Sequence, residues 1–152
     1  MKRVLAFDLG ASSGRAILAE YDGKRLNYQE IHRFENNPRD AQGHFRWNFE
    51  ELMNNIRLGV KWAGQCDSLA FDTWGVDFGL LDKDGQLLED PVHYRDARTE
   101  GMVERALESF PADGLYGETG TQIMNINSLF QLLAIKEQEP QLWEKAHRLL
   151  FM

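Results

Sequence analysis

The segment between residues 8 and 15 holds the residue types that can bind a phosphate group. Asp8 closes one apolar run, Arg15 opens the next, and the turn between them contains Gly10, Ala11, Ser12, Ser13 and Gly14. Residues with little or no side chain let the backbone approach a ligand closely, and the serines add hydroxyl groups. The guanidinium of Arg15 is a planar fork of donors that suits phosphate oxygens. A single carboxylate such as Asp8 can hold a water molecule of a hydrated magnesium ion. The segment therefore indicates a phosphate loop beside a Mg²⁺ site.

One alternative for this turn is excluded and another stays open on the residues alone. A P-loop of the Walker type requires G-x-x-x-x-G-K-[ST] followed by a helix, and the segment has neither the lysine nor the helix. Residues 16–19 instead form a second apolar run, so the turn is expected to join the two strands of a hairpin. An ordinary turn remains the alternative, because glycine and serine dominate turns for conformational reasons.

The elements that position this turn are predicted to be a three-stranded antiparallel meander, a helix and a parallel strand. Asp22-Gly23 is a strong hairpin signal, and residues 26–34 alternate apolar and polar side chains as a third strand does. Asn48 is expected to cap a helix, with Glu51 completing a capping-box pair and Gly64 ending it. A strand that arrives by way of such a helix should lie parallel to the first strand, through a right-handed crossover.

That later strand repeats the opening of the chain. Ala70-Phe71-Asp72 has the same residues as Ala6-Phe7-Asp8, and a glycine again follows, at Gly75. If the two strands are parallel, both carboxylates emerge at the same edge of the sheet, where open α/β sheets bind ligands. Coincidence between two buried strands is the alternative.

The rest of the chain is expected to alternate short strands and helices. The expected elements are a hairpin over 76–88, a helix capped by Thr99 and extending to Phe110, a helix capped by Asn127 or Ser128, a helix that begins at Pro140, and a strand over 147–152. Arg95, Asp96 and Arg98 are expected to form a structural ion-pair network for the most part. His32 is interpreted as a surface or edge residue, not a metal ligand.

Composition limits the class of protein and its partners. The 152 residues fit one domain, and a net charge of −7 argues against nucleic acid or an anionic membrane as the main partner. A local cluster of donors can still bind ATP on an acidic protein. The single cysteine, Cys66, excludes an internal disulfide framework, and no segment has the roughly 20 apolar residues of a membrane helix. We therefore expect a cytoplasmic protein.

Five blocks of the sequence together resemble the FGGY family of carbohydrate kinases, in the family's order. They are residues 8–15 (DLGASSGR), 30–34 (EIHRF), 72–78 (DTWGVDF), 94–99 (YRDART) and 127–132 (NSLFQL). The resemblance covers nearly the whole chain. It implies an α/β, ribonuclease-H-like fold of the actin and hexokinase type, with a mixed sheet flanked by helices, and it makes residues 1–152 an N-terminal kinase lobe.

The resemblance also implies an activity and the residues that serve it. Residues 10–15 would hold the ATP phosphates and Asp8 would hold Mg²⁺ through water. The acceptor would be the 1-hydroxyl of L-rhamnulose, with Gly75 leaving room for the ketose. Trp74 and Asp77 would line or support the sugar pocket, with Asp77 as an acceptor for a sugar hydroxyl, and Asn127 is a weaker candidate. Trp74 is equally open to a role in the core.

The resemblance implies that part of the enzyme lies outside this chain. The general base of the family is an aspartate in a later segment, beyond Met152, and a second lobe supplies the adenosine pocket. No catalytic residue is therefore assigned here, and the chain is expected to be a natural or designed N-terminal piece that is inactive alone. The missing C-terminal lobe is the expected partner, and an exposed apolar patch is expected where it docks.

Two alternatives to a kinase for L-rhamnulose stay open. The first is a kinase for fuculose or xylulose, and the second is a non-catalytic sugar- or nucleotide-binding module.

Overall fold

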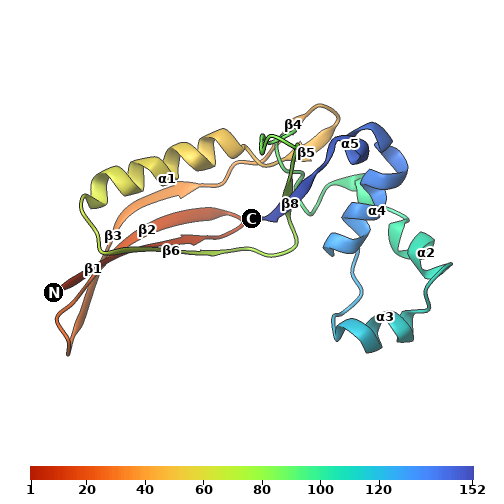
Figure 1. Ribbon diagram of the computed structural model, residues 1–152. Helices are drawn as coiled ribbons and strands as arrows, with labels where there is room; N and C mark the ends of the chain where they lie inside the picture. The colour runs from red at the N-terminus through yellow and green to blue at the C-terminus, as the bar shows by residue number, and fades with distance from the viewer. The chain divides into compact units, whose positions relative to one another are not determined.

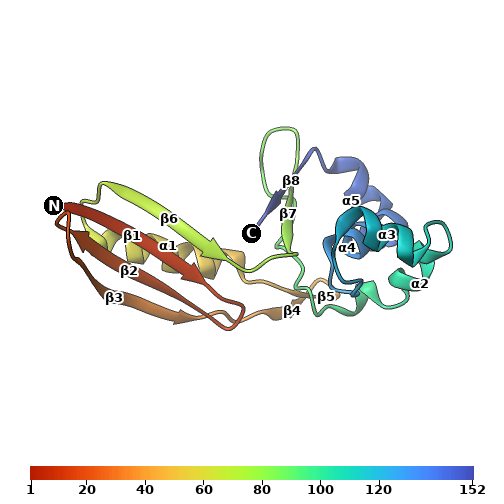
Figure 2. The ribbon, with the colours of Figure 1, turned by 90° about the horizontal axis from the view of Figure 1, so that it is seen from below.

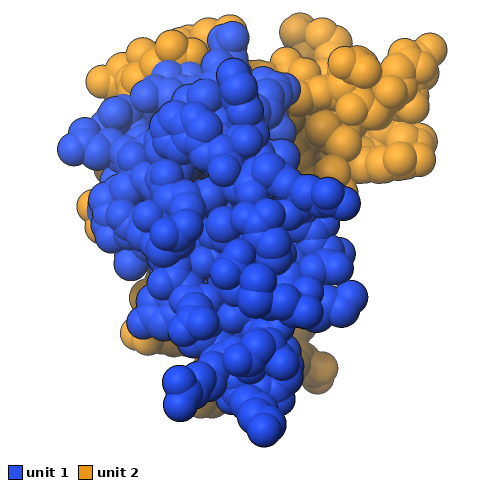
Figure 3. All heavy atoms as spheres, turned by 90° about the vertical axis from the view of Figure 1, so that its left-hand side faces the viewer, with its two compact units in different colours: residues 1–38, 47–75 blue, residues 39–46, 76–152 orange.

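A computed structural model describes all residues, 1–152, and the chain divides into two compact units. Unit 1 contains residues 1–38 and 47–75, and unit 2 contains residues 39–46 and 76–152. Figure 3 colours the two units. Because the chain passes between the units more than once, each unit is built from separate stretches of sequence. The assignment of residues 1–152 to a single kinase lobe stays a prediction.

Unit 1 is built on a four-stranded mixed sheet in the order β3-β2-β1-β6. Its strands are β1 (Lys2–Leu9), β2 (Ser13–Tyr21), β3 (Leu26–Glu35) and β6 (Ser68–Thr73), and they lie side by side in Figure 2. The first three strands are antiparallel neighbours, whereas β1 and β6 are parallel. The predicted meander and the predicted parallel strand are therefore both confirmed.

Helix α1 (Phe49–Ala63) covers one face of this sheet, as Figure 1 shows. Its Asn48 cap accepts a hydrogen bond from the amide of Glu51, and Gly64 ends it with φ 67°. On the sheet, the side chains of alternate residues, such as Leu5 and Phe7, are buried on the face that α1 covers. The closest approach is at Gly59, where an added Cβ would lie 2.8 Å from the Phe7 ring.

His32 is partly buried on the covered side of β3, rather than free at the surface. Its Nε2 lies 2.9 Å from Oδ1 of Asn55 in α1, and its ring meets the edge of Trp62 at 4.7 Å between centroids. His32 was interpreted as a surface or edge residue: its strand does lie at an edge of the sheet, but helix α1 covers this side chain. The side chain therefore has a structural role between strand and helix.

Strand β6 forms the other edge of the sheet, and its apolar side chains are only partly covered. Phe71 stacks on Phe7 with 5.1 Å between ring centroids, yet Leu69 and Phe71 are each 51% exposed. An exposed apolar patch was predicted at the place where the C-terminal lobe would dock, and the assignment of this strip to that place stays a prediction.

Unit 2 contains two small sheets and a group of short helices. The sheets pair β4 (Arg39–Ala41) with β5 (His44–Arg46) and β7 (Phe78–Leu81) with β8 (Arg148–Phe151). The helices are a 3₁₀ turn (Ala97–Thr99), α2 (Met102–Leu107), α3 (Ala112–Thr119), α4 (Ser128–Gln138) and α5 (Pro140–Lys145). Its apolar core centres on Phe78, Leu80 and Ile135. None of the helices combines the length and apolar character that a bilayer crossing needs.

Two predicted elements of unit 2 are shorter than expected. The helix predicted from Thr99 is divided into the 3₁₀ turn and α2, because Gly101 lies between them with φ 77°, outside the helical region. The hairpin predicted over 76–88 forms only in part. Its first strand begins at Phe78, because Val76 has φ 69° and cannot continue a strand, and its second half contributes only an isolated bridge from Leu87 to Leu81, while β7 pairs with β8. The helix at Pro140 and the final strand agree with prediction.

Candidate functional site

The turn between β1 and β2 keeps part of its backbone available for a ligand. The Gly10 amide donates to the carbonyl of Ser13 at 2.9 Å, and Asn36 donates to the carbonyls of Ser12 and Gly10. The amides of Ala11 and Ser12 have no acceptor within the chain. Two adjacent N–H groups at the tip of the turn are therefore available to phosphate oxygens or another anion.

Gly14 has a packing role that the sequence did not reveal. Gly14 of β2 lies opposite Phe34 of β3, and an added Cβ at Gly14 would come within 2.2 Å of the Phe34 ring. A real Cβ cannot occupy that position, so the absence of a side chain makes room for an aromatic ring in the core. This contact does not test the prediction that Gly14 is part of a phosphate loop.

Asp8 and Arg15 form an ion pair across the hairpin. They occupy opposite positions in the pairing of β1 and β2, and Arg15 Nε lies 3.2 Å from Asp8 Oδ2. Their side chains are 43% and 39% exposed, so both can be reached by a ligand. The predicted phosphate ligand and the predicted magnesium residue thus neutralise each other in this structure, and a bound nucleotide would have to separate them.

Asp72 lies beside Asp8 on the neighbouring strand. The two are paired in the parallel register of β1 and β6, so both carboxylates lie at the same edge, as the repeated sequence predicted. No group of three or more histidine, cysteine or acidic side chains is arranged to hold a metal directly. The role of Asp8 as a carboxylate that holds Mg²⁺ through water stays a prediction.

Trp74 and Gly75 follow β6 within unit 1. The Trp74 ring packs on the fully buried Trp47, with 4.3 Å between ring centroids, so it contributes to packing in unit 1. Gly75 is exposed, and a Cβ added there would meet nothing within 4 Å. The fold of the chain therefore does not itself require glycine at this position. A requirement imposed by a ligand remains compatible with that open space.

Asp77 begins a buried polar network in unit 2. It is 0% exposed, and Gln131 donates to it with 3.2 Å between Nε2 and Oδ1. Arg98 donates in turn to Gln131 Oε1 at 2.8 Å, and burial lowers the pKa of this guanidinium, although nearby carboxylates oppose the shift. A side chain so enclosed supports its surroundings, and its predicted role as an acceptor for a sugar hydroxyl stays a prediction.

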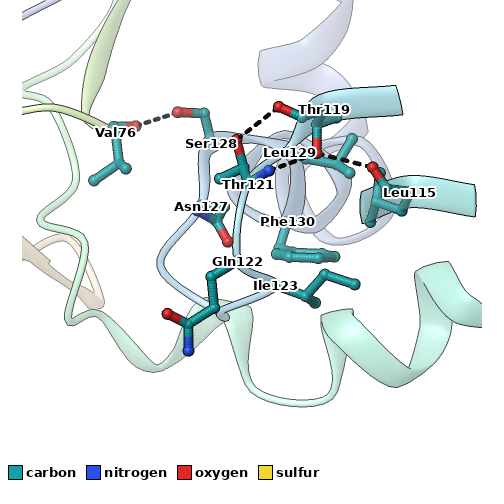
Figure 4. Close-up of a pocket in the computed structure, with 10 residues that line it drawn as sticks. All are labelled: Val76, Leu115, Thr119, Thr121, Gln122, Ile123, Asn127, Ser128, Leu129 and Phe130. Atoms are coloured by element: carbon teal, nitrogen blue, oxygen red, sulfur yellow. Dashed lines mark hydrogen bonds between the residues drawn. The ribbon is translucent and has the colours of Figure 1, made fainter. Parts of the chain in front are cut away.

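Asn127 precedes α4 and lines a pocket of about 290 Å³ in unit 2. Its Oδ1 accepts from the amide of Met124 at 2.7 Å, so its side chain does not cap the helix. Ser128, the other candidate cap, donates its hydroxyl to the carbonyl of Val76 at 2.7 Å, as Figure 4 shows. Both predicted capping side chains therefore point back to earlier parts of the chain.

A second polar cluster fixes the loop before α2. Asp96 accepts from the amides of Phe45 and Arg98 and lies 3.0 Å from Nδ1 of His44. Burial acts to raise the pKa of Asp96, but these hydrogen bonds and the His44 ring outweigh it and hold the pKa below its ordinary value. Asp96 and Arg98 thus have structural roles, but the predicted ion-pair network does not form among Arg95, Asp96 and Arg98: Asp96 pairs with His44, and Arg98 donates to Gln131.

Sequence analysis missed two features of unit 2. Gln131 falls within the quoted block 127–132, but an isolated glutamine on a helix carries no pattern that predicts burial. The positive φ of Val76 is also unexpected, since branched residues rarely adopt it.

Comparison with known proteins connects this arrangement to one family. The pattern of the FGGY family of carbohydrate kinases, N-terminal domain, matches residues 3–152. A rhamnulokinase of Halalkalibacterium halodurans is 42% identical over 100% of this chain and 33% of its own length. A rhamnulokinase of Oceanobacillus iheyensis is 41% identical over 97% of this chain and 32% of its own length. The chain thus spans about a third of the length of these curated relatives.

Solved structures of sugar kinases share the fold. A ligand-bound xylulose kinase from Lactobacillus acidophilus superposes with a TM-score of 0.81 over 98% of this chain and 31% of its own, at 15% identity. A xylulose kinase from Rhodospirillum rubrum gives a TM-score of 0.80 over 97% of this chain and 32% of its own, at 16% identity. The predicted fold class, an α/β fold of the actin and hexokinase type with a mixed sheet, is confirmed.

Proposed function

The chain belongs to the FGGY family of carbohydrate kinases, whose N-terminal domain it matches, and we propose that it is part of an ATP-dependent kinase for L-rhamnulose. In the proposed reaction the γ-phosphoryl group of ATP passes to the 1-hydroxyl of the ketose and gives L-rhamnulose 1-phosphate. The observation that carries this proposal is the identity of 42% and 41% to two curated rhamnulokinases across nearly the whole chain.

The proposed contribution of unit 1 is to hold the terminal phosphates. The free amides of Ala11 and Ser12 would donate to phosphate oxygens, and Arg15 would exchange the Asp8 carboxylate for a phosphate group. Asp8, released from the ion pair, would accept hydrogen bonds from water bound to Mg²⁺. The metal would neutralise charge that develops on the phosphates during transfer.

The residues proposed to serve the sugar are Trp74, Gly75, Asp77 and Asn127. The open space at Gly75 would admit the ketose, and the Asn127 amide group, whose oxygen is already bonded, would donate to a hydroxyl. Asp77 would support the sugar pocket indirectly, through Gln131, whose amide donates a hydrogen bond to the Asp77 carboxylate. No catalytic base is proposed within residues 1–152.

Binding measurements on the 152-residue chain test the proposal. Titration calorimetry should detect L-rhamnulose and, separately, Mg·ATP, while the chain by itself should transfer no phosphate. L-fuculose and D-xylulose serve as matched ketoses, and tighter binding of either would refute the substrate assignment. Binding of sugar without any binding of Mg·ATP would favour the alternative of a sugar-binding module.

A further inference from the structure

Val76 has a backbone conformation that its side chain disfavours. Its φ is 69°, in the left-handed region, where a β-branched residue is a rare outlier. Such a conformation persists only where surrounding contacts hold it, and it concentrates at functional sites. Because φ is the rotation about the bond from N to Cα, this angle and ψ together set how the Gly75–Val76 peptide group is oriented relative to the Val76 carbonyl.

Two side chains of α4 hold that carbonyl. The Ser128 hydroxyl donates to Val76 O at 2.7 Å, and Gln131 Nε2 lies 3.2 Å from the same oxygen. Both donors lie more than 50 positions later in the sequence, as the separations of 52 and 55 residues show. The conformation of Val76 is therefore imposed by tertiary contacts rather than by local sequence.

The orientation of the Gln131 amide is fixed by its partners. Its oxygen accepts from Nη2 of Arg98 at 2.8 Å, and arginine can only donate. The NH₂ group must consequently face the opposite way, toward the oxygens of Val76, Asp77 and Ile126. Since Gln131 is only 1% exposed, water cannot replace these bonds readily.

We propose that Gln131 is a positioning residue, which holds Val76 in its left-handed conformation and so sets the orientation in which the Gly75–Val76 peptide meets the sugar. The part that concerns sugar rests on the proposed function. The part that concerns Val76 does not, because the backbone conformation can be measured without ligand.

The test compares Gln131→Met with two control variants in the isotopically labelled 152-residue chain. Met matches the shape of Gln but removes both the donor and the acceptor. Gln138→Met is the matched control, because Gln138 lies on the same helix and donates to the Arg98 carbonyl without contacting Val76. Leu142→Ala is a control for stability, because Leu142 packs against the core around Phe78 and Ile135.

Three quantities are measured for each variant: the thermal unfolding midpoint, the Cα and Cβ chemical shifts of Val76, and the L-rhamnulose dissociation constant from the shift of the Gly75 amide. Gln131→Met should move the Val76 shifts away from left-handed values and weaken sugar binding by about tenfold or more. Neither control should move the Val76 shifts, even where Leu142→Ala lowers the midpoint as much.

Left-handed shifts for Val76 together with an unchanged dissociation constant in Gln131→Met would overturn the inference. A change in the Val76 shifts in a chain that binds no sugar would support the positioning role and refute the proposed function, so the two failures are distinguishable. If Gln131→Met does not fold, Ser128→Ala removes the other bond to the same carbonyl from a partly exposed residue. Val76 shifts that leave the left-handed values in that variant would show that the Gln131 bond alone does not hold the conformation and would contradict the inference, whereas unchanged shifts would support it.

A glycine at position 76 provides a rescue experiment. Glycine adopts positive φ without steric cost, so Val76→Gly combined with Gln131→Met should recover sugar affinity relative to Gln131→Met alone. A purely structural role for Gln131 predicts no such recovery, and an affinity that stays low in the double variant would count against positioning.

Discussion

Gly14 and Gly75 both belong to the predicted site, but only Gly14 is required to be glycine by its surroundings in the fold. A side chain at Gly14 would collide with Phe34, whereas a side chain at Gly75 would meet nothing in the chain. Packing therefore explains the first glycine completely, while the second has no structural explanation within this molecule. A residue that the fold does not require is the better place to look for a requirement imposed by a ligand.

Gly75→Ala should separate ligand binding from stability. Gly75 has no positive φ, so alanine should leave stability unchanged or raise it by about 0.4–1 kcal/mol through the unfolded chain. Binding of L-rhamnulose should nevertheless be lost, because the methyl group occupies space proposed for the sugar. Thermal unfolding and calorimetric titration check the two effects.

Gly14→Ala is the contrasting control for that experiment. Overpacking at the Phe34 ring should destabilise the chain by about 1–3 kcal/mol, whatever ligand is present. Sugar binding that survives Gly75→Ala intact would contradict the assignment of this position.

At the scale of elements, the sequence predicted best those structures whose signals are local. Asp22-Gly23 encodes its turn, Asn48 and Gly64 mark the ends of α1, and the alternation of residues 26–34 specifies β3. The repeated Ala-Phe-Asp triplet also identified two strands that are indeed paired in register. Each of these inferences needs only a few neighbouring residues.

The features that sequence analysis missed depend on distant partners. The ends of α2 and the conformation of Val76 follow from contacts or backbone angles that no short segment specifies. Ser128 was expected to cap α4 but donates to Val76, 52 residues earlier. The Asp8–Arg15 pair depends on strand register. Local propensity cannot distinguish such uses of one side chain, because they are decided by tertiary packing.

Helix glycines provide a prediction at this scale. Gly59 in α1 would bring a Cβ within 2.8 Å of Phe7 and 2.9 Å of Ala16, whereas Gly117 in α3 has open space. Gly117→Ala should stabilise the chain by about 0.5–1 kcal/mol through helix propensity. Gly59→Ala should destabilise it by about 1–3 kcal/mol, since overpacking outweighs propensity. Chemical denaturation of both variants measures the difference, and equal signs would contradict the close approach of α1 to the sheet.

The Asp96 cluster predicts how stability depends on pH. The pKa of Asp96 is lower in the folded chain than its ordinary value of 3.8, so the contribution of this carboxylate to the free energy of unfolding is present above pH 3.8. As pH falls through the lower folded pKa, protonation removes the contribution. Asp96→Asn should therefore cost about 1–3 kcal/mol at neutral pH and progressively less on acidification below about pH 4. A cost that is independent of pH would refute an electrostatic origin.

At the scale of the whole molecule, the two units are interleaved along the chain. Residues 39–46 belong to unit 2, although unit 1 precedes and follows them. Arg46 from this insertion is buried, and its Nη1 donates to the carbonyl of Asp90 at 2.6 Å and lies 2.9 Å from Oε1 of Glu89. A contiguous piece of sequence therefore does not supply a complete unit 2.

A fragment of residues 76–152 tests this interdependence. It contains most of unit 2 but lacks β5, so Asp96 loses the Phe45 amide and Glu89 loses Arg46. We expect poorly dispersed amide resonances from this fragment, and recovery when a peptide of residues 39–46 is added or fused. Dispersed spectra from the fragment alone would show that the insertion is dispensable.

The interleaving also limits how relatives of this chain can exchange parts. A chimera that takes unit 1 from one parent and unit 2 from another must be joined after residues 38, 46 and 75. A single recombination event anywhere in this stretch mixes both units, and each hybrid then inherits mismatched partners in at least one of them. Recombination between relatives is therefore expected to keep the two units together. Exchange of segments between homologous chains should succeed most often when the junction lies near either end of the chain.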